Sequence, residues 1–184
     1  VVGPDEFHTR YPGTDSPGLN NNAYTNVMAA WVLQTASIVL GLLADDWRTE
    51  LLATLDLTDE DLRRWEEIGR RMYVPFHGDS LISQFEGWDD LEELDWDRLR
   101  SKYGDIQRLD RLLESEGDDP NRYKASKQAD VLMLFFLFSS EELKTTFDKL
   151  GYRFDPECIP RNVKYYLGRT SHGSTLSSVV HAWV

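Results

Sequence analysis

Residues 25–44 of this chain read TNVMAAWVLQTASIVLGLLA and form its longest apolar-rich segment. The apolar side chains recur at helical spacing, so the segment predicts a long α-helix. Its richness in Ala, Val and Leu predicts a helix that is buried on most sides. Gln34, Thr35 and Ser37 interrupt the apolar run, which favours a buried helix over a membrane span. We therefore expect a helical chain built around this segment.

The same spacing continues along the chain and predicts an all-α fold. Thr58 precedes an acidic turn and an apolar stripe, which is a helix-start signal, and that helix is expected to stop before Pro75. Residues 76–85 indicate a small hairpin or extended loop, and residues 87–97 indicate a structured surface loop. The other expected helices span 46–55, 106–116, 126–138, 141–150 and 156–166, and a loop at 168–175 leads into a last helix that runs to Val184.

Length and charge bound the function. At 184 residues the chain is long enough for one domain, or part of one, with a sizeable core. Its net charge of −12 argues against nucleic acid, whose phosphates need a basic surface, and against an anionic membrane. A sugar or another small polar ligand is the more natural partner.

The cysteine and histidine content bounds the chemistry. Cys158 is the only cysteine, which excludes an intrachain disulfide and a cysteine-based metal site. None of the four histidines is spaced as a ligand pair, so no metal site is expected. The opening residues, Val1 to Pro4, lack the basic and apolar regions of a signal peptide. We therefore expect a cytoplasmic protein.

The stretch Gly3-Pro4-Asp5-Glu6-Phe7-His8 places two adjacent carboxylates in a loop ahead of the long helix. A carboxyl group that burial or neighbouring charge keeps protonated acts as a general acid. In an inverting glycosidic cleavage that acid protonates the leaving oxygen while a nucleophile attacks from the opposite face. Adjacent acids on a Pro-Gly loop are also common as plain surface charge, so both interpretations stay open.

Three later stretches carry further candidate residues. The loop 168–175 combines hydroxyls, Arg, His and two glycines ahead of a helix, which suits an oxyanion or phosphate, although a simple capping loop has the same composition. Lys127-Gln128 could donate to sugar hydroxyls, or they could form a solvated first turn. The stretch 84–88, Gln-Phe-Glu-Gly-Trp, is typical of a carbohydrate platform and equally of core aromatics beside a surface acid.

Taken together, four stretches resemble glycoside hydrolase family 65. They are Gly3 to His8, Asn21 to Asn26, Lys127 to Leu132 and Arg169 to Ser174, in family order from one end of the chain to the other. The family comprises inverting phosphorylases of maltose, trehalose or kojibiose, with acid trehalases as hydrolytic relatives. The resemblance implies part of an (α/α)6 six-hairpin barrel in which phosphate, attacking an α-linked glucose disaccharide, releases β-glucose 1-phosphate.

The resemblance also implies roles for single residues. Glu6 becomes the general acid, no cofactor is needed, and inorganic phosphate is a co-substrate. The expected substrate-binding residues are Lys127, Gln128, His8 and Glu86, and the expected phosphate-binding residues are Arg169, Ser171, His172, Gly173 and Ser174.

Departures from the family pattern accompany this resemblance. Phe7 stands where many members have Tyr, and the insert from Arg10 to Leu19 lengthens the loop beside the acid. Residues 1–184 are expected to form one partial catalytic domain, the second half of the barrel, without the family's β-sandwich and C-terminal β domain. Without the missing half of the parent chain we expect little activity, exposed apolar helix faces and self-association into a homo-oligomer.

Two alternatives stay open beside the phosphorylase. One is an inverting hydrolase of trehalose or a related disaccharide, in which a carboxylate activates water. The other is a non-catalytic helical module for carbohydrate binding or assembly.

Overall fold

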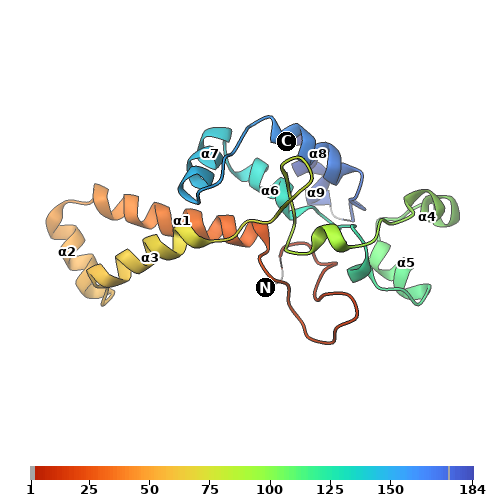
Figure 1. Ribbon diagram of the computed structural model, residues 1–184, viewed down its shortest axis with the longest axis horizontal. Coiled ribbons are helices and arrows are strands. Elements are labelled where there is room, and N and C mark those ends of the chain that lie inside the picture. Colours follow the sequence, from red (N-terminus) through yellow and green to blue (C-terminus); the bar gives the residue numbers. More distant parts are fainter. Residues whose placement is uncertain (1–2, 174) are drawn as a thin grey trace.

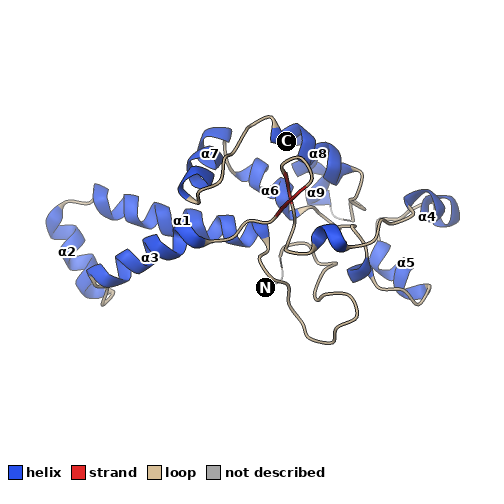
Figure 2. Cartoon of the chain, viewed as in Figure 1, coloured by secondary structure: helices blue, strands red, loops and turns tan. Residues whose placement is uncertain are grey.

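The computed structural model describes residues 3–173 and 175–184, without the side chain of Leu176, and its regular structure is almost entirely helical (Figure 1; Figure 2). The α-helices are α1 (Ala23–Leu42), α2 (Asp45–Thr54), α3 (Asp59–Arg71), α4 (Trp96–Tyr103), α5 (Leu109–Ser115), α6 (Asp130–Leu137), α7 (Ser140–Lys149), α8 (Cys158–Leu167) and α9 (Thr175–Trp183). Two short 3-10 helices, η1 (Trp88–Asp90) and η2 (Pro120–Arg122), join them.

Helices α1, α2 and α3 form an arm that projects from the rest of the chain (Figure 1). The side chain of Asn22 caps α1 by accepting a hydrogen bond from the Thr25 N–H. Thr58 and Asp61 form a capping box at the start of α3, as the sequence predicted. Helix α3 runs back along α1 and ends at Arg71, ahead of Pro75, so α1 and α3 make a helical hairpin with α2 at its tip.

The prediction that the long helix is buried on most sides is wrong. Of the residues in α1, only Ala23, Val27, Ala30 and Leu40 are buried, and Val32, Ile38, Val39 and Leu42 are exposed. An apolar composition shows that a helix can be buried, but burial also needs neighbouring elements that cover it. Helix α1 is covered by α3, α6 and α7 over only part of its surface. Exposed apolar faces are therefore present, and self-association stays a prediction.

By length and composition alone, α1 is also long and apolar enough to cross a membrane. Its most apolar 18-residue window is 17% buried. Core helices of soluble proteins pass the same test, so this property does not distinguish the two kinds of helix.

The predicted hairpin is present and is antiparallel, with β1 (Phe76–His77) pairing to β2 (Leu81–Ile82). It is fixed to α8 by two buried side chains. The Asn162 Oδ1 accepts from the Ile82 N–H at 2.9 Å, and the Tyr166 hydroxyl donates to the Ile82 carbonyl at 2.5 Å. The hairpin thereby joins the core instead of lying on the surface.

Two hydrophobic clusters fill the interior. The larger one lies among α1, the hairpin, α6, α7 and α8, with Trp88 and Tyr166 as its largest fully buried side chains. The smaller one gathers residues of α4 and α5 around Leu99 and Leu109, and it includes Phe7 from the N-terminal loop. Phe7 thus anchors that loop in the smaller core.

Two helix predictions need correction. The expected helix at 126–138 begins only at Asp130, so residues 126–129 are extended or bent ahead of α6. Helix α4 lies in and beyond the stretch expected to be a surface loop, and the side chain of Asp95 caps it by accepting from the Arg98 N–H at 2.9 Å. Asp before a helix is a start signal, so this element was readable from the sequence.

Candidate active site

Glu6 lies on a loop whose neighbouring side chains are buried. Asp5 and Phe7 on either side of it are each 3% exposed, whereas the Glu6 side chain is 68% exposed. Phe7 packs in the smaller core, while Asp5 is held by the segment that leads into α6. The loop therefore presents one carboxyl group to solvent from a backbone that is fixed on both sides.

Asp5 is held through both its backbone and its carboxylate. Its N–H donates to Asp130 Oδ1 at 2.6 Å, and its Oδ1 accepts from the Lys127 N–H at 2.9 Å. Asn22 Nδ2 donates to Asp130 Oδ2 at 3.1 Å. This buried network joins the stretches of Asp5 and Asn22 to the segment of Lys127 and Asp130, which lies more than a hundred residues further along the chain.

Asp130 is the most strongly perturbed acid of the network. Burial first, and then the nearby charge of Asp5, raise the pKa of Asp130 to about 8, against the opposing effect of hydrogen bonds from Asn22 and from the Asp5 N–H. Two carboxyl groups this close resist joint ionisation. Burial and the charge of Asp5 therefore disfavour the ionised form of Asp130, while the two donated hydrogen bonds favour it.

His8 was expected to bind substrate, and the structure instead gives it a supporting position. Its Nδ1 is 3.0 Å from Asp5 Oδ2 and its Nε2 is 2.9 Å from the Tyr123 carbonyl oxygen. The side chain is 2% exposed and packs against the rings of Phe85 and Trp88. Both ring nitrogens are in use, so His8 has no free atom to offer a sugar.

Lys127 lies beside the candidate acid. Its Nζ is 2.5 Å from Glu6 Oε2, and the Lys127 side chain is 25% exposed. The neighbouring Gln128 donates from Nε2 to the Pro4 carbonyl at 3.1 Å. Both residues precede α6 instead of forming its first turn, and the structure brings both to the Glu6 loop.

The candidate phosphate loop is joined to the same segment by backbone hydrogen bonds. Ser126 and Thr170 form a parallel bridge, in which the Ser126 N–H donates to the Arg169 carbonyl at 2.8 Å and the Ser171 N–H donates to the Ser126 carbonyl at 2.9 Å. Because Ser126 adjoins Lys127, this bridge brings the loop to the Glu6–Lys127 pair.

Three side chains of this loop have buried polar atoms with no hydrogen-bond partner among the described residues, namely Arg169 Nε, Ser171 Oγ and His172 Nδ1. His172 has a φ of +53°, and burial lowers its pKa. Its ring is 4.9 Å from that of His181, whose pKa burial and His172 lower to about 4. Burial therefore favours the neutral form of both imidazoles. Ser174, the last predicted phosphate residue, lies outside the described residues.

Gly173 fits against backbone so closely that no side chain has room. A Cβ at this position would lie 2.4 Å from the Gln107 carbonyl oxygen and 3.3 Å from Lys127 Cγ. We expect Gly173→Ala to lower the free energy of unfolding by about 1–3 kcal/mol, because the backbone oxygen cannot give way without strain. Urea denaturation measures the loss.

Gly41→Ala is the matched control for this substitution. Gly41 lies in α1 with nothing within 4 Å of the added Cβ, so the change is expected to be neutral or stabilising by up to about 1 kcal/mol. Equal stability of the two variants would contradict the close approach at Gly173.

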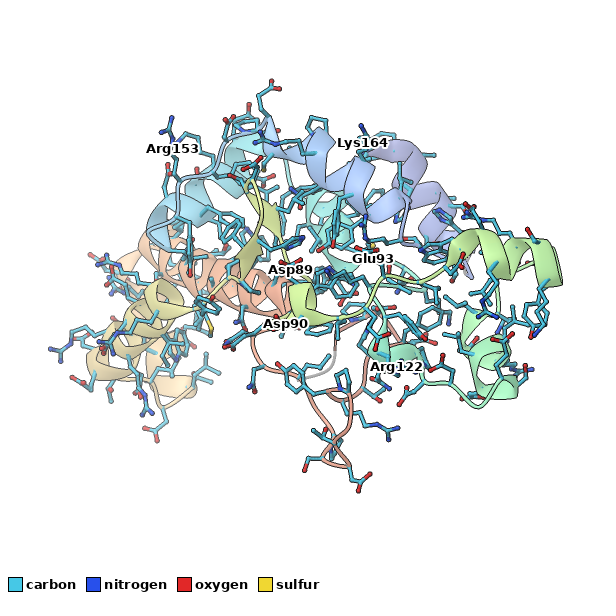
Figure 3. All side chains as sticks on the ribbon, turned by 45° about the vertical axis from the view of Figure 1, so that its right-hand side comes forward. Asp89, Asp90, Glu93, Arg122, Arg153 and Lys164 are labelled. Carbon is cyan, nitrogen blue, oxygen red and sulfur yellow. The ribbon has the colours of Figure 1, made fainter. Side chains whose placement is uncertain are left out.

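Arg169 was expected to bind phosphate; both terminal nitrogens of its guanidinium group are engaged, and Nε has no partner among the described residues. Nη2 donates to Glu93 Oε1 at 2.8 Å, and the guanidinium lies 3.9 Å from the centroid of the Tyr165 ring. Asp89 and Glu93, labelled in Figure 3, lie on η1 and just after it. Arg169 therefore ties the loop to that segment in this structure.

The predicted aromatic platform at 84–88 belongs to the core. Phe85 is 2% exposed and Trp88 is fully buried, so neither ring offers a face to a sugar, and the hypothesis of a carbohydrate platform is wrong. Glu86 stays on the surface, where its Oε2 accepts from Asn21 Nδ2 at 2.7 Å. Its expected role in substrate binding stays a prediction.

Asn22, Gln84 and Asp130 lie in stretches that were named from the sequence, but no role was predicted for these three residues. The side chains of these residues connect the Glu6 loop to α6 and α1. They come from three separate stretches of the chain, so no local pattern shows that they meet. The usable signal was a carboxylate at the entrance to the apolar segment 131–138, because a charged residue before a buried run needs a partner. Among residues 3–173 and 175–184, no group of three or more His, Cys, Asp or Glu is placed to hold a metal ion.

Comparison with known proteins finds similarity along the whole chain. The profile of the glycosyl hydrolase family 65 central catalytic domain matches residues 1–184. The chain is 59% identical over 184 residues to an uncharacterized glycosyl hydrolase of Mycobacterium tuberculosis, covering 100% of this chain and 14% of that protein. It is 36% identical over 185 residues to the trehalose 6-phosphate phosphorylase of Lactococcus lactis, covering 100% of this chain and 22% of that protein.

A solved structure gives the same result for the fold. A human-microbiome protein with the provisional name of kojibiose phosphorylase matches with a TM-score of 0.67 and 27% identity, covering 99% of this chain and 23% of its own. This likeness confirms the fold class, an all-α part of an (α/α)6 toroid. The chain spans less than a quarter of the length of each of these relatives.

Proposed function

The chain belongs to glycosyl hydrolase family 65, and from this we propose that it carries the general acid and the phosphate-facing loop of an inverting α-glucoside phosphorylase. The observation that supports this most is the meeting of three stretches. Glu6 contacts Lys127, and the segment of Lys127 is bridged to the loop of Ser171. The proposed acid and the proposed phosphate loop are thus both joined to the segment of Ser126 and Lys127, although the three stretches are separate in sequence.

In the proposed reaction, Glu6 donates its proton to the glycosidic oxygen as the bond from that oxygen to the anomeric carbon breaks. A phosphate oxygen forms the new bond to the anomeric carbon from the opposite face, which gives β-glucose 1-phosphate and a free acceptor. The N–H groups at the start of α9, which follows the loop, and the positive end of its dipole favour an anion there.

In this scheme Lys127 contacts Glu6 before substrate binds and the sugar afterwards. In the described structure its ammonium group meets the Glu6 carboxylate at 2.5 Å. A general acid must hold a proton before it donates one, so the ion pair of Glu6 and Lys127 has to open in the proposed reaction. We infer that sugar hydroxyls take over Lys127 when the disaccharide binds, which frees Glu6 to act on the glycosidic oxygen.

The hydrolase alternative needs a carboxylate that activates water. Asp5 is adjacent to Glu6, but its side chain is 4% exposed and is engaged by His8 and by the Lys127 N–H. Asp5 is therefore not free for that role. Phosphate is already an anionic nucleophile, so the phosphorylase needs no such base.

The test is the dependence of turnover on phosphate, measured in the complete polypeptide that the gene encodes. With an α-linked glucose disaccharide such as kojibiose or trehalose, we expect cleavage only when phosphate is present. The anomeric configuration of the sugar phosphate, followed by NMR at early times, is expected to be β. Cleavage at an unchanged rate in phosphate-free buffer would show that the enzyme is a hydrolase.

A further inference from the structure

One buried carboxyl group ties the Glu6 loop to α6. Asp130 is 1% exposed, and both of its oxygens accept hydrogen bonds, Oδ1 from the Asp5 N–H and Oδ2 from Asn22 Nδ2. We propose that Asp130 is a positioning residue that sets the placement of Glu6 relative to Lys127. This inference rests on the proposed function, because it concerns the proton donor of that reaction.

The contacts form a reciprocal clasp. Asp130 accepts the N–H of Asp5, while the carboxylate of Asp5 accepts the N–H of Lys127. Glu6 follows Asp5 in the chain, and its carboxylate oxygen Oε2 is 2.5 Å from the Nζ of Lys127. These two hydrogen bonds therefore fix the backbone at Asp5, which adjoins the candidate acid, and at Lys127, its cationic partner. A shift of either backbone segment would move the carboxyl group of Glu6 relative to the ammonium group of Lys127.

The groups around Asp130 are closely packed. A Cβ at Gly3 would lie 2.0 Å from Asp130 Oδ2 and 2.3 Å from Asn22 Nδ2. The loop backbone therefore approaches Asp130 as closely as glycine allows. Gln84 closes the other side, because its Oε1 accepts from the Asp130 N–H at 2.5 Å.

The orientation of the Asn22 amide is fixed by its second bond. Its Oδ1 accepts from the Thr25 N–H at 2.9 Å as the cap of α1, so its Nδ2 must face Asp130. An amide at position 130 presents only one acceptor and would set one N–H group against another. Exchanging the two side chains restores complementarity, because Asp at 22 can accept from Asn at 130 and still cap α1.

The test compares Asp130→Asn with the exchange double variant, Asn22→Asp combined with Asp130→Asn, in the complete polypeptide. We expect Asp130→Asn to lower kcat about a hundredfold, since displacement of a reacting group by about 1 Å costs that much. KM for phosphate is expected to change by less than about threefold, because the clasp does not touch phosphate. The exchange variant is expected to recover kcat to within about fivefold of wild type.

Asn162→Ala is the control for a purely structural effect. Asn162 is a fully buried polar side chain that ties the hairpin to α8, and its hydrogen bonds join Ile82 and Cys158, neither of which belongs to the Glu6 loop. We expect it to lower the midpoint of thermal unfolding as Asp130→Asn does, with kcat unchanged. If Asp130→Asn does not fold, Asp130→Glu replaces it, since the extra methylene displaces both acceptors and is expected to lower kcat in the same way.

Three results would overturn the proposal. The first is a kcat within about threefold of wild type when Asp130 is replaced. The second is an exchange variant whose kcat is as low as that of Asp130→Asn. The third is an Asn162→Ala variant whose kcat falls as much as that of Asp130→Asn. If wild type itself turns over no substrate, the proposed function fails, and amide hydrogen exchange decides the positioning role separately. Exchange at residues 5–7 is expected to speed up in Asp130→Asn and to recover in the exchange variant, and unchanged rates would refute the clasp.

Discussion

Replacing Glu6 by Gln is expected to lower kcat of the complete polypeptide by about 10²–10⁴-fold, the usual contribution of a positioned general acid. The amide keeps the size of the side chain and its exposed setting but has no acidic proton for the leaving oxygen. Steady-state cleavage of an α-linked glucose disaccharide in phosphate buffer measures the loss. A decrease smaller than about tenfold would exclude Glu6 as the proton donor.

A second substrate separates lost chemistry from lost structure. α-Glucosyl fluoride has a leaving group that needs little protonation, so Glu6→Gln is expected to retain most of its activity with this donor. Glu60→Gln is the matched control, because Glu60 is an exposed acid of α3 paired with Arg63, and its kcat on both substrates is expected to equal that of wild type. Equal loss on both donors in Glu6→Gln would point to misfolding of the loop.

Replacing Trp88 by Ala is expected to lower the free energy of unfolding by about 3–5 kcal/mol. Trp88 is fully buried and packs with the rings of Phe85 and Tyr166. Its Nε1 also donates to the Tyr165 hydroxyl at 3.1 Å. Truncation leaves a large cavity in the main core, and a loss of this size is a large share of the stability of a typical domain. Chemical denaturation of the chain measures it.

Trp47→Ala is the control for this prediction. Trp47 is 71% exposed on α2, so its loss is expected to change stability by no more than about 0.5 kcal/mol. A loss below about 1 kcal/mol in Trp88→Ala would contradict the core position of Trp88. It would reopen the reading of this residue as a sugar-facing platform.

The helices were largely predictable because their signals are local. Helical spacing and the Thr58 cap placed the arm α1–α3, and Gly78 marked the hairpin. The start of α6 was placed four residues early, because apolar periodicity cannot show that Ser126 is held in a bridge to Thr170. The bridge partner lies more than forty residues away in the chain.

The site was predictable in part for the same reason. The stretches of Glu6, Lys127 and Ser171 were named from their composition and from the family resemblance, and the structure brings them together. The position of His8 was not predictable, since a histidine beside an acid has the same sequence whether it faces substrate or the core. Its burial depends on Tyr123 and Phe85, which come from other segments.

The sequence by itself determined the helical class, the hairpin, the family and the identity of the chemical groups in the Gly3-Pro4-Asp5-Glu6-Phe7-His8 stretch. Each of these depends on spacing or residue type along a short segment. Only the tertiary structure decided which faces of α1 are covered, that Trp88 is core, and that Asp130 holds the loop of Glu6. Burial and hydrogen bonding between distant segments are properties of surfaces in contact, and no local pattern specifies which surface a segment will meet.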